Sequence, residues 1–296
     1  MNRFSIRQRG VALVLVMWLI AALTLVVVGA TQWIRSDNRL NRALIDQAQQ
    51  RSQAKGMVFL LMRDMEAASR AGVYSGRGLF EAEYQVGSDL FKLEARSITG
   101  LINLNRAPEE LLVLLFRQAL DLDSQEATAM AHRFLDWREP SELKRLQGAD
   151  LGDYQAAGLT FGPRGSRFLV IEDIMQVLGV TLEDYEKLKD LVTVLPTTAF
   201  GVNPAAAPAG VLKVLSTGDE RLFDQLIEIQ QDASQDITGR MFELLPSEMI
   251  TTTSSRDFRV DVTVLSSLGQ ERSFRFWVVH SPSRSQVTGV PWKVVH

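Results

Sequence analysis

One segment near the N-terminus limits what this chain can fold into more than any other feature. Between Gly10 and Ile34 there is no charged residue, and Val11–Ala30 reads VALVLVMWLIAALTLVVVGA. A helix of this length, at about 1.5 Å per residue, spans roughly the 30 Å hydrocarbon core of a bilayer. A buried core helix is seldom apolar on every side over so many residues. The sequence therefore predicts a transmembrane helix over residues 11–34.

The charges around this segment predict its orientation. Residues 1–10 contain three Arg and no acid, and the rest of the chain has 29 basic residues (32 minus 3) against 35 acids. Because basic flanks stay on the cytoplasmic side, we expect a single-pass inner-membrane protein with a cytoplasmic N-terminus and most of its mass in the periplasm. A cleaved secretory signal ending near Val28–Ala30 is the alternative, although such signals have shorter apolar stretches of about 7–15 residues.

The composition and the motifs argue against an enzyme and against a nucleic-acid-binding protein. The chain has no Cys and three His, which excludes disulfides, thiolate nucleophiles and zinc sites with Cys ligands. Its net charge of −3 does not favour a phosphate backbone. The sequence has no Gly-rich phosphate loop and no HExxH or GxSxG motif. The carboxylates and histidines considered for catalysis are interpreted as caps, surface groups or structural residues: Asp121, Asp123, Glu126, His132 and His280.

The pattern after the apolar segment predicts a long helix and then antiparallel strands. Residues 35–71 contain no Pro and continue the helix into water, with an apolar stripe that faces the chain's own following domain. Phe91, Leu93 and Ala95 alternate with charged residues, which indicates a hairpin over residues 81–98. A second alternating hairpin over residues 258–278 can complete the same sheet. The stripe on the helix consists of Ala54, Val58, Leu61, Met65 and Ala68.

The segment between the two hairpins is predicted to be helical and contains an internal repeat. Residues 100–112 read GLINLNRAPEELL, and residues 200–212 read FGVNPAAAPAGVL. Each copy indicates an extended segment that turns into a helix near a Pro, where the missing N–H is not needed. Residues 171–194 are similar to a helix-hairpin-helix module, but its six acids and two lysines would repel a phosphate backbone. We therefore interpret this hairpin as packing architecture.

The junction before the apolar segment resembles the leader junction of type IV pilins and of type II secretion pseudopilins. Arg9 and Gly10 are followed directly by the apolar run from Val11. In these families a prepilin peptidase cleaves after the Gly on the cytoplasmic side, so the resemblance implies cleavage between Gly10 and Val11 and N-methylation of Val11. Most members carry Glu at the fifth mature position, which is Leu15 here. The K-type minor pseudopilin of type II secretion is the member that usually lacks this Glu.

Further segments in the same order resemble the K-type minor pseudopilin over essentially the whole chain. They are GLINLNRAPEELL, RFLDWRE, VIEDIMQVLGVTLEDYEKLKDLVTVLP and VNPAAAPAGVL. The resemblance implies an α+β fold with a long N-terminal transmembrane helix, a pilin-like antiparallel sheet and an inserted all-helical domain similar to SAM and helix-hairpin-helix domains. The expected parts are a leader at 1–10, a membrane helix at 11–34, its periplasmic continuation at 35–71, the first strands at 72–99, the insert at 100–199, a second Asn-Pro helix with the closing strands at 200–280, and a tail at 281–296.

The resemblance also implies a function. A K-type minor pseudopilin sits at the tip of the pseudopilus and helps to start its assembly for the export of folded proteins across the outer membrane. Its implied partners are the I- and J-type minor pseudopilins, the major pseudopilin, the prepilin peptidase and the inner membrane, with no nucleic acid. Two alternatives stay open at this point. One is a minor pilin of a type IV pilus or competence system, and the other is a signal-anchored periplasmic adaptor or enzyme without a filament role.

The same resemblance raises the question of calcium. Family members can bind calcium through an acidic loop after an Asp-Trp element, followed by a Gly-Ala-acid tripeptide. Asp136 and Asp150 match these elements, and Asp153 lies near. The stretch between them, REPSELKRLQ, carries three cations where an Asp-rich loop is expected, whereas calcium takes six to eight oxygen ligands. We therefore expect no cofactor and interpret these acids as a solvated helix end.

Overall fold

The computed structural model describes residues 11–71, 78–140, 143–232, 237–267, 269–280 and 292–295, and in the first helix the side chains from 13 to 28 and from 44 onward. The chain divides into two compact units, Met1–Ala54 and Lys55–His296. The predicted leader at residues 1–10, which includes Gly10, lies outside the described residues.

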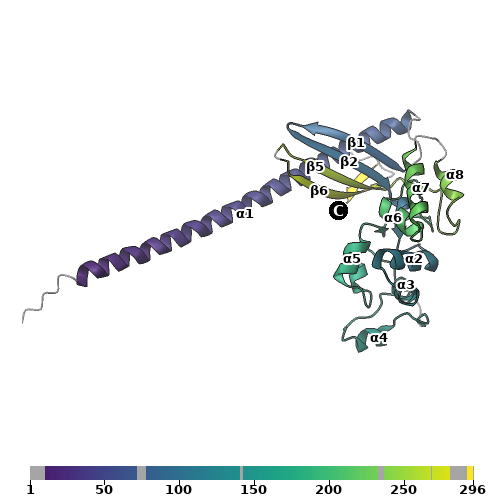
Figure 1. Cartoon of the computed structure of the whole chain (residues 1–296), viewed down its shortest axis with the longest axis horizontal. Helices are drawn as coiled ribbons and strands as arrows, with labels where there is room; N and C mark the ends of the chain where they lie inside the picture. Colours follow the sequence, from purple (N-terminus) through teal and green to yellow (C-terminus); the bar gives the residue numbers. More distant parts are fainter. Residues whose placement is uncertain are drawn as a thin grey trace, which may run out of the picture. The chain divides into compact units, whose positions relative to one another are not determined.

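A single long helix, α1 (Val11–Arg70), begins where the apolar segment begins. In the first unit, which holds most of this helix (Figure 1), the described side chains from Leu13 to Val28 are all exposed according to their accessible surface. Among the described side chains, no helix is at once long enough and apolar enough to cross a membrane.

The second unit contains a five-stranded antiparallel sheet, as expected from the two alternating hairpins. Its strands are β1 (Leu79–Val86), β2 (Asp89–Ser97), β5 (Phe258–Leu265), β6 (Glu271–His280) and β7 (Trp292–Val295), in the spatial order β1-β2-β5-β6-β7. Because β2 pairs with β5 along its whole length, the second hairpin completes the sheet that the first one begins. The observed class, mixed helix and antiparallel sheet, confirms the predicted α+β arrangement at that level.

The last turns of α1 lie along this sheet (Figure 1). Val58, Leu61 and Met65 of the predicted stripe are buried. The Tyr84 hydroxyl of β1 donates a hydrogen bond to Asp64 at 2.7 Å, which fixes the helix on the sheet. This hydrogen bond lowers the pKa of Asp64 below its usual value.

The expectation of a tail over residues 281–296 needs one correction. Residues Trp292–Val295 form β7, which pairs antiparallel with β6. A strand of four residues is too short to show a period-two pattern in the sequence, and its pairing with β6 supplies the hydrogen bonds that hold it.

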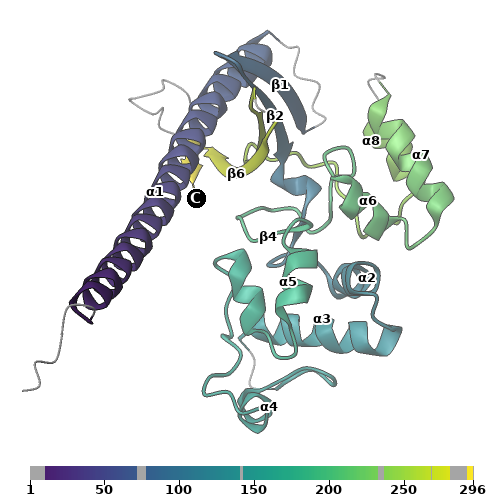
Figure 2. The ribbon, with the colours of Figure 1, turned by 60° about the vertical axis from the view of Figure 1, so that its left-hand side comes forward.

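The whole connection between β2 and β5 is here called the helical insert (Figure 2), and it includes α6, α7 and α8, which follow the expected insert at residues 100–199. α2 packs against α3, α5 and α6, and α7 packs against α6 and α8. Two short parallel strands, β3 (Ile102–Asn103) and β4 (Val192–Thr193), pair near the start of the insert. Its helices are α2 (Glu109–Leu120), α3 (Ser124–Arg138), α4 (Leu151–Ala156), α5 (Leu182–Leu188), α6 (Ala209–Leu215), α7 (Glu220–Gln231) and α8 (Ile237–Phe242), with the 3-10 turns η1 (Ile98–Gly100) and η2 (Ile171–Gln176).

Local capping residues set where several of these helices begin. Asp123 accepts hydrogen bonds from the backbone of Gln125 and Glu126, and the Glu126 carboxylate accepts one from the Asp123 backbone N–H, which completes a capping box. Thr181 caps α5 in the same way. The sequence-based interpretation as caps is therefore confirmed for Asp123 and Glu126.

The two copies of the internal repeat have the same local structure. In each copy an Asn side chain accepts a hydrogen bond from the backbone two residues later, namely Asn103 from Asn105 and Asn203 from Ala205. Each extended segment also forms a parallel pairing, in the second copy between Val202 and Ile250. The Pro of each copy stands at the N-cap, and the helix α2 or α6 follows it.

Partly buried polar side chains from other helices close both repeat turns. The Arg138 guanidinium of α3 donates to the carbonyls of Leu104 and Ala107 at 2.8 Å. Gln230 of α7 donates to the carbonyls of Pro204, Ala205 and Ala207. Carbonyls that face the protein interior need such donors, so these two side chains stabilise the repeat turns.

Candidate functional site

The predicted site residues fall into two groups that lie in different units. Val11 is the first residue of α1, and Leu15 is 64% exposed on that helix. The calcium candidates Asp136, Asp150 and Asp153 belong to the second unit, on α3 and at the start of α4. Cleavage at Gly10 and methylation of Val11 therefore stay predictions, and the acidic candidates are the group whose geometry the structure describes.

An aromatic cluster holds the element that carries Asp136. Phe134 lies 4.7 Å from Phe116 and 5.6 Å from Phe168, measured between ring centroids. Trp137 stacks on Phe168 and on Tyr154 at 6.2 and 6.4 Å. All five rings are buried, so the C-terminal end of α3 is fixed in the core of the insert.

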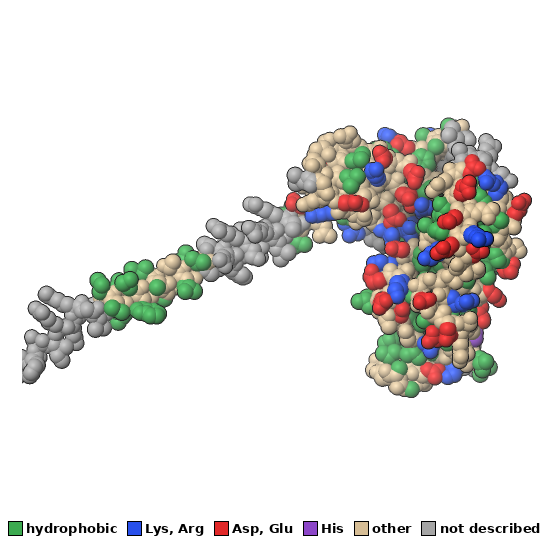
Figure 3. All heavy atoms as spheres, viewed as in Figure 1, with side chains coloured by type: hydrophobic (Ala, Val, Ile, Leu, Met, Phe, Trp, Pro, Cys, Tyr) green, Lys and Arg blue, Asp and Glu red, His purple; other side chains and the backbone are tan. Residues whose placement is uncertain are grey.

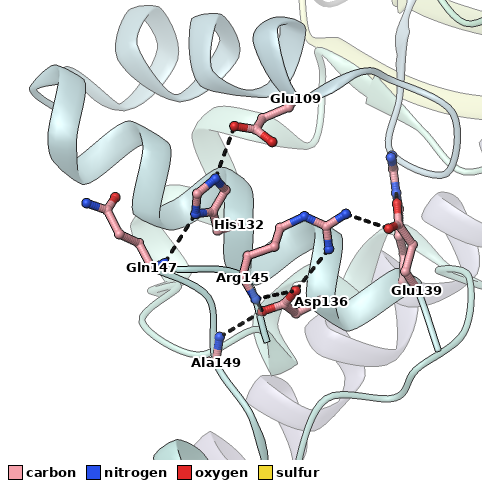
Figure 4. Close-up of polar contacts among 8 residues, drawn as sticks. Glu109, His132, Asp136, Glu139, Arg145, Gln147 and Ala149 are labelled. Carbon is pink, nitrogen blue, oxygen red and sulfur yellow. Dashed lines mark hydrogen bonds and ion pairs between the residues drawn. The ribbon is translucent and has the colours of Figure 1, made fainter. Parts of the chain in front are cut away.

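The Asp136 carboxylate is buried and accepts hydrogen bonds from the loop that follows α3 (Figure 4). The Arg145 and Ala149 backbone N–H groups donate to Oδ2 at 3.1 and 3.2 Å, and the Arg145 guanidinium donates to Oδ1 at 2.9 Å. A Cβ atom on Gly148 would lie 1.7 Å from Oδ2, so only Gly allows the loop to approach this closely. Asp136 thus organises the loop around a buried negative charge.

Arg145 also joins this carboxylate to a second one. Its Nη2 lies 2.6 Å from Glu139 Oε2, and Arg138 Nε lies 3.1 Å from Glu139 Oε1 (Figure 4). Burial acts to raise the pKa of Glu139, but the hydrogen bonds from Arg145 and Arg138 outweigh it and hold the pKa below its usual value. Glu139 is therefore ionised and paired at neutral pH.

The other two candidate acids are paired with a lysine of the same loop. Lys144 Nζ lies 2.6 Å from Asp153 Oδ2 and 3.5 Å from Asp150 Oδ2. Asp150 and Asp153 also form the capping box of α4 with each other's backbone N–H groups. The hydrogen bond from Lys144 lowers the pKa of Asp153. Both acids act as helix caps, in agreement with the sequence-based interpretation of a helix end.

His132 connects the same loop to α2. Its Nδ1 accepts a hydrogen bond from the Gln147 backbone N–H at 3.3 Å, so the proton of the neutral ring is on Nε2. That nitrogen lies 3.0 Å from Glu109 Oε1, to which it donates (Figure 4). The histidine is a structural connector, as the sequence predicted.

The sequence analysis missed the roles of several polar residues of the insert. Lys144 and Arg145 were recognised only as cations that replace expected acids. Asn105 was not considered, although it exchanges hydrogen bonds with the Phe168 backbone and donates to the carbonyl of Val194. A signal for Asn105 was present, because an Asn embedded in an apolar repeat must find partners when it is buried.

This arrangement is suited to holding a loop rather than to catalysis. Asp136, Lys144 and Asp150 line a cavity of about 360 Å³ together with Leu143 and Leu151, but each of these three charged groups is already paired. Among the described residues, no group of three or more His, Cys, Asp and Glu side chains could hold a metal ion. Acidic and basic side chains are interspersed over the face shown in Figure 3.

Comparison with known proteins gives three findings. Residues 100–197 match the family model described as type II secretion system (T2SS), protein K. The type II secretion system protein K of Dickeya chrysanthemi is 24% identical in an alignment 288 residues long. The match covers 75% of this chain and 78% of that protein. A chain in the crystal structure of the GspK–GspI–GspJ complex from enterotoxigenic Escherichia coli has the same fold, with a TM-score of 0.51 and 16% identity over 88% of this chain and 97% of that one.

The family and sequence matches support a structural component of the type II secretion system. Within that class, the findings support a minor pseudopilin of the K type. The resemblance seen in the sequence is thereby confirmed.

Proposed function

We propose that this chain is the tip subunit of a type II secretion pseudopilus, anchored in the inner membrane by residues 11–34 with the second unit in the periplasm. The observation that carries the proposal is the match of residues 100–197, the bulk of the helical insert, to protein K. In this role the chain starts pseudopilus assembly and so supports the export of folded proteins across the outer membrane.

The anchor is supported by the apolar segment itself. Residues 11–34 contain no charge, and a basic segment precedes them. The described side chains from Leu13 to Val28 belong to one continuous helix and are exposed, as lipid-facing side chains must be. The positive flank favours a cytoplasmic N-terminus, which places the rest of the chain in the periplasm.

The partners are supported by the solved complex that has the same fold. That structure is of a complex of GspK with GspI and GspJ. We infer that the chain assembles with minor pseudopilins of the I and J types, and that the major pseudopilin and the prepilin peptidase also interact with it.

The tip position is supported by two features of the chain. The insert occupies the whole connection between β2 and β5, so the head is larger than the sheet alone and would obstruct a subunit stacked above it. Leu15 stands where pilin-like subunits carry the Glu that neutralises the N-terminal amine of a neighbour. A subunit without that carboxylate is suited to the first place in the filament.

Processing of the N-terminus tests the pilin-like assignment. We expect the protein extracted from membranes to begin at Val11, with a methylated amine, only when the prepilin peptidase is present. Intact-mass spectrometry of protein from strains with and without the peptidase measures this directly. A matched control is Gly10→Leu, which should leave the leader in place in both strains. A chain that starts at Met1 or at Thr31 in the presence of the peptidase would contradict the assignment.

Substitution of Leu15 tests the tip position. Leu15→Glu restores the carboxylate that other pilin-like subunits use, so we expect the variant to enter the filament at internal positions and secretion to fall. Crosslinking between subunits of purified pseudopili, together with a secretion assay, checks both effects. Leu15→Val is the control, since it keeps the position apolar. Unchanged subunit order and normal secretion with Leu15→Glu would count against the tip proposal.

A further inference from the structure

We infer that the loop over residues 143–150, here called the cation loop, is held in place by the chain's own lysine and arginine, so that the helical insert of this protein folds without a divalent metal. The inference does not rest on the proposed place in the filament. It concerns the part of the insert where the family resemblance raises the question of calcium.

The oxygens of the candidate carboxylates already accept hydrogen bonds from donors of this chain. Both oxygens of Asp136 accept from N–H groups of the cation loop, and Asp153 Oδ2 accepts from Lys144 and from the backbone of Asp150. Calcium requires six to eight oxygen ligands at about 2.3–2.6 Å. To bind these acids it would have to displace a guanidinium and an ammonium group, and it would leave the donor N–H groups without acceptors.

The negative charge of Asp136 is balanced by a cation of the same chain. Asp136 is buried, and Arg145 at 2.9 Å provides the positive charge that a buried carboxylate needs. Arg145 reaches Glu139 with its other terminal nitrogen, so one guanidinium bridges two carboxylates. A planar group with donors fixed in a fork is suited to this bridging, and an ammonium group is not.

The backbone of the cation loop lies directly against the Asp136 carboxylate. The cation loop passes so close to Asp136 that a Cβ atom on Gly148 would overlap its carboxylate. The backbone N–H groups of Arg145 and Ala149 therefore donate directly to Asp136, and the loop leaves little room beside that carboxylate oxygen. The loop N–H groups and its two cations supply the hydrogen bonds and the positive charge that these carboxylates need.

The experiment compares the full-length protein in detergent with excess EGTA and with millimolar CaCl2. Hydrogen–deuterium exchange of the peptide that contains Gln147 and Ala149 reports the loop directly, and the thermal unfolding midpoint reports the insert. For the native chain we expect the same exchange rate and the same midpoint in both conditions. Calcium present at a hundredfold excess over its Kd would instead raise the midpoint by roughly 5–10 °C, and such a rise, or slower exchange, would overturn the inference.

Variants of Arg145 test whether this cation holds the cation loop in place. Arg145→Ala should increase the exchange rate of Ala149 at least about tenfold and lower the midpoint by about 4–8 °C. Arg145→Lys keeps the positive charge but lacks the forked guanidinium. Its exchange rate and its unfolding midpoint should therefore lie between those of the native chain and those of Arg145→Ala. Arg167→Ala removes an exposed arginine of the same insert and is the control. Exchange in Arg145→Ala equal to that of Arg167→Ala would overturn the inference, even if neither chain responds to calcium.

Discussion

Alanine in place of Gly100 is expected to lower the free energy of unfolding by about 3 kcal/mol or more, because this residue lies where the two copies of the internal repeat cross. A Cβ atom at position 100 would lie 2.3 Å from the carbonyl oxygen of Ala206 and 2.4 Å from its carbonyl carbon. These are backbone atoms, which cannot rotate away as a side chain can.

The surrounding hydrogen bonds prevent the backbone from moving aside. The Asn203 N–H donates to the Thr99 carbonyl at 2.7 Å, and Gln230 and Arg96 both donate to the Ala207 carbonyl. A shift of the second repeat would therefore break several buried hydrogen bonds at once. The cost of each buried group left without a partner is about 1–3 kcal/mol.

Denaturant unfolding of Gly100→Ala and Gly56→Ala provides the measurement with a matched control. Gly56 lies in α1, and apart from the adjoining residues and backbone of its own helix nothing lies within 4 Å of the position that its Cβ would take. Since Ala favours a helix over Gly by about 1 kcal/mol, Gly56→Ala should leave stability unchanged or raise it. Equal stability of the two variants would show that the crossing of the repeats is not tightly packed.

Asp136→Ala is expected to lower the free energy of unfolding by about 3–5 kcal/mol, the range found when one member of a buried ion pair is removed. The variant leaves the Arg145 and Ala149 backbone N–H groups and the Arg145 guanidinium without their acceptor. Asp224→Ala removes an exposed acid from α7 and serves as the control, with an expected change within about 0.5 kcal/mol.

A double-mutant cycle with Arg145→Ala tests the cause of this loss. Because the two side chains form one network, the double variant should lose less stability than the two single variants added together. Circular dichroism during guanidinium unfolding measures all four chains of the cycle. Strict additivity would mean that Asp136 acts on the loop without its arginine partner.

Elements built from local patterns could be predicted from the sequence. The alternation in residues 81–98 and 258–278 predicted two hairpins, and both are present. Asp123 and Glu126 were recognised as caps because a cap is encoded within four residues of the chain. The expectation that the second hairpin completes the sheet of the first was also right, because β2 pairs with β5.

Features made by residues far apart in the chain could not be predicted. The parallel pairing of β3 with β4 joins two strands of two residues each, which leave no periodic signal. Arg138 and Gln230 donate to repeat turns that lie more than twenty positions away. In the candidate site, the acids were identified by their chemical type, but the pairing of Lys144 and Arg145 with them depends on how the loop folds back on α3.

The pairing of β2 with β5 has a consequence for how the protein is made. Ser97, the last residue of β2, hydrogen-bonds to Ser255 across 158 positions of chain. At typical synthesis rates these 158 positions take roughly 10–30 s to make. Until β5 has been made, β2 has no neighbouring strand on the side away from β1. A hairpin with an unpaired edge is open to pairing with other chains. The half-made sheet is therefore the stage at which a newly made chain most needs protection from aggregation.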